Sequence, residues 1–229
     1  MVRVVCTGLG RTGTNSIKAA LERLGYGPCL HAVDLFANPR LIRPLLGAIE
    51  SGSADWDEVL AGYESFVGGP VSTRWRELAE YYPEAKVIHT IRDPERWLGS
   101  IQETLFRRRQ RMSSLPGRTA VLLSSMLGTD YAPMVKLLQT TLESQTFKSP
   151  AEQTRERAIE LFKAHTNEVV ETIPASRLLI FDVKSGWEPL CKFLDVPMPA
   201  EPFPRMNDRA EYAKSGLGTA VPLLLRRTR

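Results

Sequence analysis

The stretch Gly8-Leu-Gly-Arg-Thr-Gly-Thr-Asn-Ser16 joins an apolar run to a helical pattern, and the interpretation of the whole chain starts from it. The run before it, Val2 to Thr7, is typical of a short buried strand. After it, apolar residues at 17, 20, 21 and 24 recur with the helical period, and Gly25 supplies a stop. A strand, a glycine-rich loop and a helix in this order form an anion site, because the first N–H groups of the helix lack partners and its dipole favours negative charge.

Two common nucleotide-binding loops match this stretch in part. Gly8, Gly10 and Gly13 have the spacing of a dinucleotide-binding fingerprint, which also requires an acidic residue about 20 residues further on, where Asp34 could serve. A kinase-type loop requires a lysine at the position of Thr14. Because neither match is complete, an NAD(P)-binding oxidoreductase and a catalytically silent nucleotide-binding module stay open as alternatives.

A third interpretation makes Arg11 the cation of a phosphate site that uses no metal. Arg11 then replaces both the lysine and the metal ion of a kinase loop, and the residues after it donate hydrogen bonds to a terminal phosphate. These donors are Thr12, Gly13, Thr14, Asn15 and Ser16. The glycines allow the phosphate to approach because they carry no side chain.

A second motif lies about eighty residues further along the chain. The segment 85–91 predicts a strand that ends at Arg92, and Pro94 suits the first turn of a following helix. Ser100 lies about two turns along that helix. Ligands of parallel sheets bind outside the carboxyl ends of the strands, so we expect Arg92 and the first loop at the same edge. There Arg92 offers a fork of donors and Ser100 a hydroxyl to a second phosphate.

Together the two motifs resemble those of sulfotransferases that use 3′-phosphoadenosine 5′-phosphosulfate (PAPS). The likeness rests on Arg11-Thr-Gly-Thr-x-Ser16 after a strand and on Arg92 and Ser100 at their spacing. It extends to 27–31, 82–86 and 177–207, which are similar to a bacterial and fungal sulfotransferase-like subgroup. Gly68-Gly69-Pro70 departs from that subgroup, where an Asp-Trp-Pro-like sequence is expected.

The resemblance implies a reaction. A hydroxyl or amine of a small-molecule acceptor would take the sulfuryl group of PAPS by in-line attack, and 3′,5′-adenosine bisphosphate would leave, with no metal involved. Arg11 to Ser16 would hold the phosphosulfate, with Arg11 stabilising the charge that develops on the leaving phosphate. Arg92 and Ser100 would hold the 3′-phosphate.

A base must take the proton of the acceptor. We assign this role to His31, which follows an apolar patch near the active edge of the sheet and has a suitable ordinary pKa. Asp34 and His165 are the alternatives, and His89, inside a strand, is expected to be packed.

Strand-like and helical segments alternate along the chain, which predicts an α/β fold with a three-layer arrangement, a parallel sheet carrying helices on both faces. We expect one domain over 1–229, and the resemblance implies a P-loop-like sulfotransferase architecture. A helical lid is expected at about 101–149 and a C-terminal tail at about 209–229. Further strands are expected at 28–33 and 177–181, helices at about 151–171 and 187–194, and a mixed helical segment over 38–80.

The composition fits a slightly basic soluble enzyme. The formal net charge is +4, too small to indicate a nucleic-acid partner. Three cysteines stand far apart, as in proteins of a reducing compartment. No run approaches the roughly 20 apolar residues of a membrane span, so we expect a cytoplasmic protein without stable membrane insertion. The acceptor and the oligomeric state are not predicted.

Overall fold

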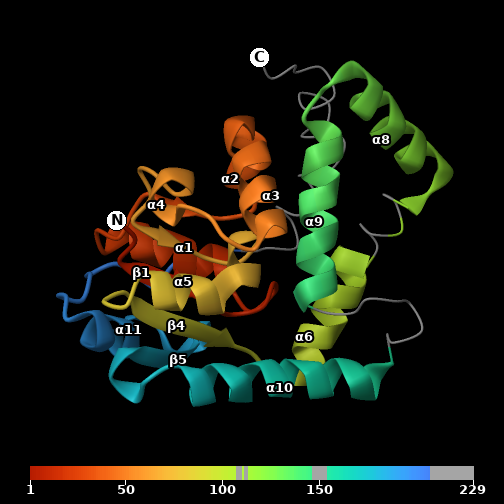
Figure 1. Cartoon of the computed structure of the whole chain (residues 1–229). Coiled ribbons are helices and arrows are strands. Elements are labelled where there is room, and N and C mark those ends of the chain that lie inside the picture. The colour runs from red at the N-terminus through yellow and green to blue at the C-terminus, as the bar shows by residue number, and fades with distance from the viewer. Residues whose placement is uncertain (107–109, 111–112, 146–153, 207–229) are drawn as a thin grey trace.

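The computed structural model describes residues 1–106, 110, 113–145 and 154–206 of the chain (Figure 1). The expected tail at about 209–229 lies outside these residues, as do parts of the expected lid. No helix in the described ranges is both long enough and apolar enough to cross a membrane. The cysteines are buried and unpaired.

A five-stranded parallel sheet forms the centre of the fold, with the strand order β2-β3-β1-β4-β5. All four strand pairings are parallel, and β1 lies in the middle. The strands are β1 (Val4–Cys6), β2 (Cys29–Leu30), β3 (Ser65–Phe66), β4 (Lys86–Ile91) and β5 (Leu178–Asp182). Runs such as the one in β1 are apolar throughout because strands of a parallel sheet are buried on both faces.

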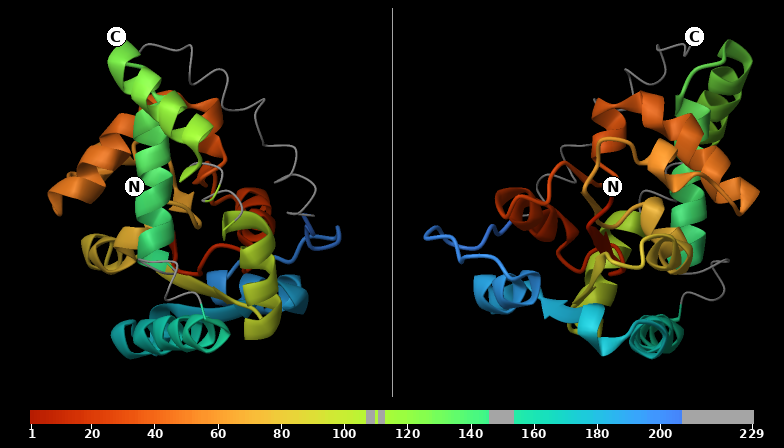
Figure 2. Two further views of the ribbon diagram at one scale, coloured as in Figure 1. Left: turned by 90° about the vertical axis from the view of Figure 1, so that its right-hand side faces the viewer. Right: turned by 60° about the vertical axis from the view of Figure 1, so that its left-hand side comes forward.

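Helices cover both faces of this sheet, which confirms the predicted α/β arrangement (Figures 1 and 2). One face packs on α1 (Thr14–Arg23) and α11 (Trp187–Leu194) through residues such as Ile17 and Leu190. The other face packs on α5 and α10, and α2, α3, α4 and α9 extend that core. The bounds are α2 (Asp34–Ala37), α3 (Ile42–Ser51), α4 (Trp56–Val59), α5 (Trp75–Tyr81), α9 (Tyr131–Gln145) and α10 (Arg155–Thr172).

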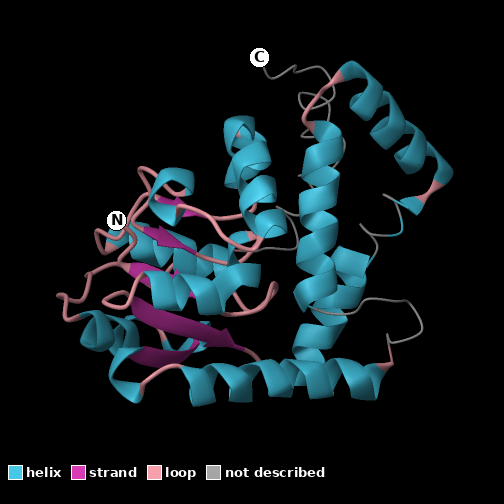
Figure 3. Ribbon diagram, in the orientation of Figure 1, coloured by secondary structure: helices cyan, strands magenta, loops and turns pink. Residues whose placement is uncertain are grey.

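The remaining helices lie beyond the carboxyl edge of the sheet. After β4 the chain forms α6 (Pro94–Ile101), a short π-helix (Gln102–Phe106) and, further on, α8 (Leu115–Leu127), which packs against α9 (Figure 3). The segment expected to form a lid is therefore helical where it is described. Its action as a lid stays a prediction.

The expectation of a helical segment over 38–80 was wrong at one place. Ser65–Phe66 forms β3, which pairs with both β1 and β2. Two residues are too few for a strand pattern to emerge from the sequence. The strand is held instead by its neighbours, since the Ser65 hydroxyl donates to the Tyr26 carbonyl at 2.6 Å.

Gly8 is where β1 and β4 approach too closely for a side chain. A Cβ built on Gly8 would lie 1.8 Å from Thr90 Oγ1 and 2.8 Å from the Thr90 carbonyl oxygen. Thr90 cannot easily turn aside, because its hydroxyl shares a 2.6 Å hydrogen bond with that of Thr12. The first glycine of the loop is therefore required for strand packing.

We expect Gly8→Ala to lower the free energy of unfolding by about 1–3 kcal/mol or more, since the extra methyl has no room. Gly47→Ala is the matched control, because Gly47 is exposed in α3 and has open space around its Cβ position. There alanine should stabilise by roughly 0.5–1 kcal/mol. Urea unfolding of both variants measures the difference, and equal stability of the two would contradict the packing argument.

Candidate active site

Side chains bind the carbonyl oxygens of the loop between β1 and α1. The Thr12 hydroxyl donates to the Leu9 carbonyl at 2.7 Å. Trp97 Nε1 donates to the Gly10 carbonyl at 3.0 Å, and an Arg92 guanidinium nitrogen donates to the Arg11 carbonyl at 3.1 Å. Three successive carbonyl groups are thus bound by side chains, two of them from the segment that follows β4.

The start of α1 is suited to hold an anion. Gly13 is its N-cap, with a φ of 98° that favours glycine, and it provides no side-chain cap. The first turn contains no acidic residue, whereas α6 is capped by the Asp93 carboxylate. The N–H groups at the start of α1, with the positive end of the helix dipole behind them, are therefore suited to an anion.

Three predicted phosphate-binding residues lie together. Arg11 Nε donates to Ser100 Oγ at 3.0 Å, although 89 positions separate them. Arg92 is bound to the backbone of Arg11 by the contact described above. Arg11 is only 7% exposed and has a φ of 75°, an uncommon conformation for a residue with a side chain. The strand-end motif and the first loop thus form one cluster.

A pocket of about 260 Å³ connects this cluster to the start of α1. The first loop contributes Arg11, Thr12, Gly13 and Ser16 to its lining. The second motif contributes Ile91, Arg92 and Ser100, and the remaining lining residues are 182–184 and 203–206. Among the described lining residues the basic side chains, Arg11, Arg92, Lys184 and Arg205, outnumber the one acidic side chain, Asp182. Such a pocket attracts anions.

Two parts of the pocket lining, Lys184 and the segment Phe203–Met206, were not predicted as site residues from the sequence. Lys184 follows β5, and its place after a parallel strand was a usable signal because such sites lie at strand ends. The segment Phe203–Met206 gave no such signal. It reaches the pocket because the Met206 N–H donates to Ser16 Oγ at 3.1 Å, a contact between residues 190 positions apart.

Two predicted donors behave differently from the others. The Thr12 hydroxyl is engaged inside the loop and with Thr90, so this side chain shapes the loop. Asn15 Oδ1 is buried and has no hydrogen-bond partner among the described residues. An amide oxygen only accepts hydrogen bonds, so Oδ1 offers nothing to a phosphate, and Asn15 does not line the pocket described above.

His31 lies beside the first residue of α1. Its Nε2 is 3.1 Å from Thr14 Oγ1, and its Nδ1 accepts from the Val33 N–H at 3.3 Å. The neutral ring therefore carries its proton on Nε2 and donates to Thr14. Loss of hydration, and then the charges of Lys18 and Arg11, lower the pKa of His31 to about 4.

Asp34 supports the loop that carries His31. Its Oδ2 accepts from the His31 backbone N–H at 2.7 Å and lies 3.1 Å from Lys18 Nζ. A carboxylate with these partners is poorly placed to take a proton from an acceptor. Asp34 fits a positioning role.

The two other histidines lie on the opposite side of β1. His89 is buried, with its ring nitrogens 2.9 Å from Thr7 Oγ1 and 3.1 Å from Thr166 Oγ1, as expected for a packed residue. His165, on α10, donates from Nε2 to the Thr7 carbonyl at 2.8 Å. It does not line the basic pocket. The described residues contain no cluster of three or more His, Cys, Asp or Glu side chains that could hold a metal ion.

An NMR titration of His31 should give a midpoint near pH 4, below its ordinary value of 6.5. As the pH falls from 6.5 to 4, His31 binds a proton in the unfolded chain but stays neutral in the folded chain. The contribution of His31 therefore lowers the free energy of unfolding as the pH falls from 6.5 to 4, and it does not lower that free energy further below pH 4. A midpoint at 6.5 would show a hydrated ring, distant from the two cations, and would contradict the geometry.

Comparison with known proteins agrees with this site. The sulfotransferase domain family matches residues 3–212. The Ava biosynthesis cluster protein M of Aspergillus versicolor is 31% identical over 217 residues, which are 90% of this chain and 80% of that relative. The family match spans the loop, the second motif and the segment Phe203–Met206, and the chain belongs to the sulfotransferase domain family.

Proposed function

We propose that the protein transfers the sulfuryl group of PAPS to a hydroxyl or amine of a small-molecule acceptor. The observation that carries the proposal is the continuous basic pocket from the uncapped start of α1 to Arg92 and Ser100. In a member of the sulfotransferase family, this pocket has the charge and the two anion-binding ends that a nucleotide with phosphates on both its 3′ and 5′ positions requires.

The 5′ end of the nucleotide would lie at the start of α1. PAPS supplies the activated sulfuryl group there and leaves as 3′,5′-adenosine bisphosphate. The N–H groups of Thr14, Asn15 and Ser16 would stabilise the charge on the departing phosphate together with Arg11. Because the loop carbonyls are already bound elsewhere, they do not repel that charge.

The 3′-phosphate would lie between Arg92 and Ser100. Ser100 is buried at the pocket wall and already accepts from Arg11, so its own hydroxyl proton is left to donate to a phosphate. Arg92 adds a charged donor beside it. Lys184 and Arg205 line the same pocket, and we propose that they contribute further positive charge around the nucleotide.

His31 is the proposed base. Its lowered pKa keeps the ring neutral at pH 7, which leaves a lone pair for a proton, and makes it a weaker base than an ordinary histidine. To accept a proton at Nε2, the ring must carry its own proton on Nδ1. That change of tautomer gives up the 3.3 Å hydrogen bond from the Val33 N–H and the donation to Thr14, and binding of the acceptor would have to compensate for both. Nε2 then faces the start of α1, where the acceptor would attack.

We expect Arg92→Ala to weaken binding of 3′,5′-adenosine bisphosphate about 10- to 100-fold, since hydrogen bonds to charged groups contribute roughly 1.5–3 kcal/mol. Isothermal titration calorimetry in the presence of EDTA measures this. Arg96→Ala is the matched control, because Arg96 is exposed on α6, shortly after Arg92, and does not line the pocket. An unchanged affinity of Arg92→Ala would remove Arg92 from the 3′-phosphate site. Binding of NAD⁺ or MgATP in place of the bisphosphate would support the alternative nucleotide-binding functions.

We expect His31→Gln to lower the rate of transfer from ³⁵S-labelled PAPS by about 10²–10⁴-fold on any acceptor of a panel of phenols, alcohols and amines. The affinity for 3′,5′-adenosine bisphosphate should stay close to that of the wild type, because the nucleotide pocket does not include His31. Full turnover by the variant would place the base elsewhere. Tight nucleotide binding with no transfer by the wild type to any acceptor would favour the silent binding module.

A further inference from the structure

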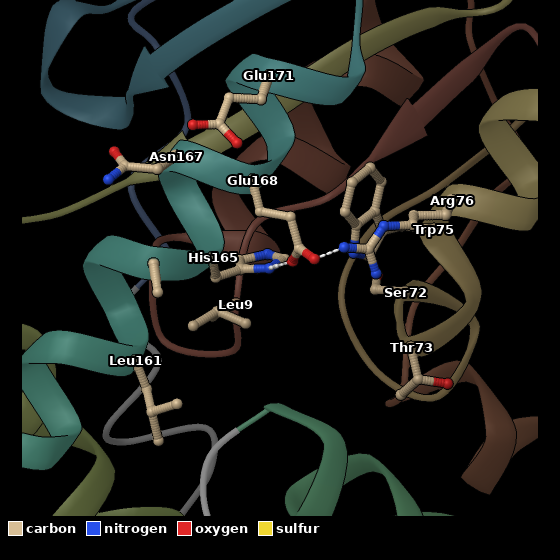
Figure 4. A pocket seen from close by; sticks show the side chains of 11 residues that line it. Leu9, Ser72, Thr73, Trp75, Arg76, Leu161, His165, Asn167, Glu168 and Glu171 are labelled. Atoms are coloured by element: carbon tan, nitrogen blue, oxygen red, sulfur yellow. Dashed lines mark ion pairs between the residues drawn. The ribbon is translucent and has the colours of Figure 1, made fainter.

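A second cavity, of about 560 Å³, lies between α5 and α10 and reaches the phosphate-binding loop (Figure 4). Leu9 lines it, and Leu9 stands two residues before Arg11, which lines the nucleotide pocket. The two cavities therefore meet different sides of one loop. A volume of this size suits a small organic molecule.

His165 lines this cavity, and its Nδ1, on the side of Glu168, is a hydrogen-bond acceptor. Its Nε2 donates to the Thr7 carbonyl, and a carbonyl can only accept, so the ring proton is on Nε2 and the lone pair is on Nδ1. The nearest carboxylate oxygen, Glu168 Oε2, lies 3.9 Å from Nδ1, beyond hydrogen-bond distance. The side chain is 16% exposed, and no hydrogen-bond donor reaches Nδ1 from the described residues.

The charged residues of the cavity leave a small negative excess. Glu168 forms an ion pair with Arg76 of α5, which crosses the cavity close to His165, as Figure 4 shows. Glu171 lines the same wall of α10 without an opposite charge among the described lining residues. The cavity therefore disfavours an anionic ligand.

The other walls combine apolar side chains with the polar residues Ser72, Thr73 and Asn167. Leu9, Leu161 and Ala164 line the cavity together with Trp75, whose ring meets that of His165 edge-on at 6.0 Å between centroids. Apolar walls around a few directed polar atoms are typical of sites for small organic molecules.

We propose that this cavity binds the body of the acceptor, and that His165 recognises it by accepting, at Nδ1, a hydrogen bond from a hydroxyl group other than the one that is sulfated. The inference rests on the proposed function, because it names the acceptor class of the same reaction: an uncharged or cationic compound with a flat apolar body and a hydroxyl group. His165 is a recognition residue in this account, and the base remains His31 at the start of α1.

The test uses three probes of one shape, namely 4-hydroxybiphenyl, its methyl ether 4-methoxybiphenyl, and 4′-hydroxybiphenyl-4-carboxylate. Binding is followed by long-range ¹H–¹⁵N NMR of the histidine rings. We expect 4-hydroxybiphenyl to shift the Nδ1 resonance of His165, and the methyl ether and the carboxylate each to bind at least about tenfold more weakly. Equal binding of phenol and ether, or a shift at His31 alone, would overturn the inference.

Two variants separate this inference from the proposed function. His165→Gln keeps a donor for the Thr7 carbonyl but lacks an acceptor at the Nδ1 position, so the phenol should lose its advantage over the ether. Ala164→Phe fills the cavity from the helix surface and should abolish binding of all three probes. Both variants should bind 3′,5′-adenosine bisphosphate as the wild type does. If His165→Gln keeps the preference for the phenol and Ala164→Phe still binds the probes, the inferred acceptor site is overturned and the proposed function is not. Absence of bisphosphate binding in the wild type overturns the proposed function.

Discussion

The binding of three successive loop carbonyls by side chains is the constraint on which the rest of this site depends. Thr12, Trp97 and Arg92 hold the carbonyls of Leu9, Gly10 and Arg11. Because side chains already bind these carbonyl groups, an anion at the start of α1 can meet N–H groups. Trp97 is fully buried and packs on Phe162 at 4.6 Å between ring centroids, so α6 and α10 together keep the loop in this shape.

The same contacts join the two proposed phosphate sites. Arg92 contacts the backbone of Arg11, and the side chain of Arg11 contacts Ser100, so the positive charge between the sites is shared. Arg11 holds a left-handed backbone conformation that costs of order 1–3 kcal/mol, and the surrounding contacts sustain it. Such a preorganised arrangement does not have to reorganise when charge develops on a leaving group.

The sequence predicted the elements with strong patterns. Strand β4, helix α11 and the two phosphate motifs were predicted because their apolar period, glycine spacing and Arg92–Ser100 spacing are local. Strand β3 has two residues and was missed, and so was Phe203–Met206, whose place depends on a contact with Ser16 far along the chain. The ring proton of His31 was also beyond prediction, since the Val33 and Thr14 contacts decide it.

The central claim is that one pocket binds both ends of a nucleotide phosphorylated at the 3′ and 5′ positions. The most direct measurement compares 3′,5′-adenosine bisphosphate with 5′-adenosine monophosphate by calorimetry on the wild-type chain in EDTA. The two ligands differ only in the 3′-phosphate that Arg92 and Ser100 are proposed to hold. The account predicts that the bisphosphate binds at least about tenfold more tightly, and without added metal. Equal affinities, or binding that requires Mg²⁺, would contradict it.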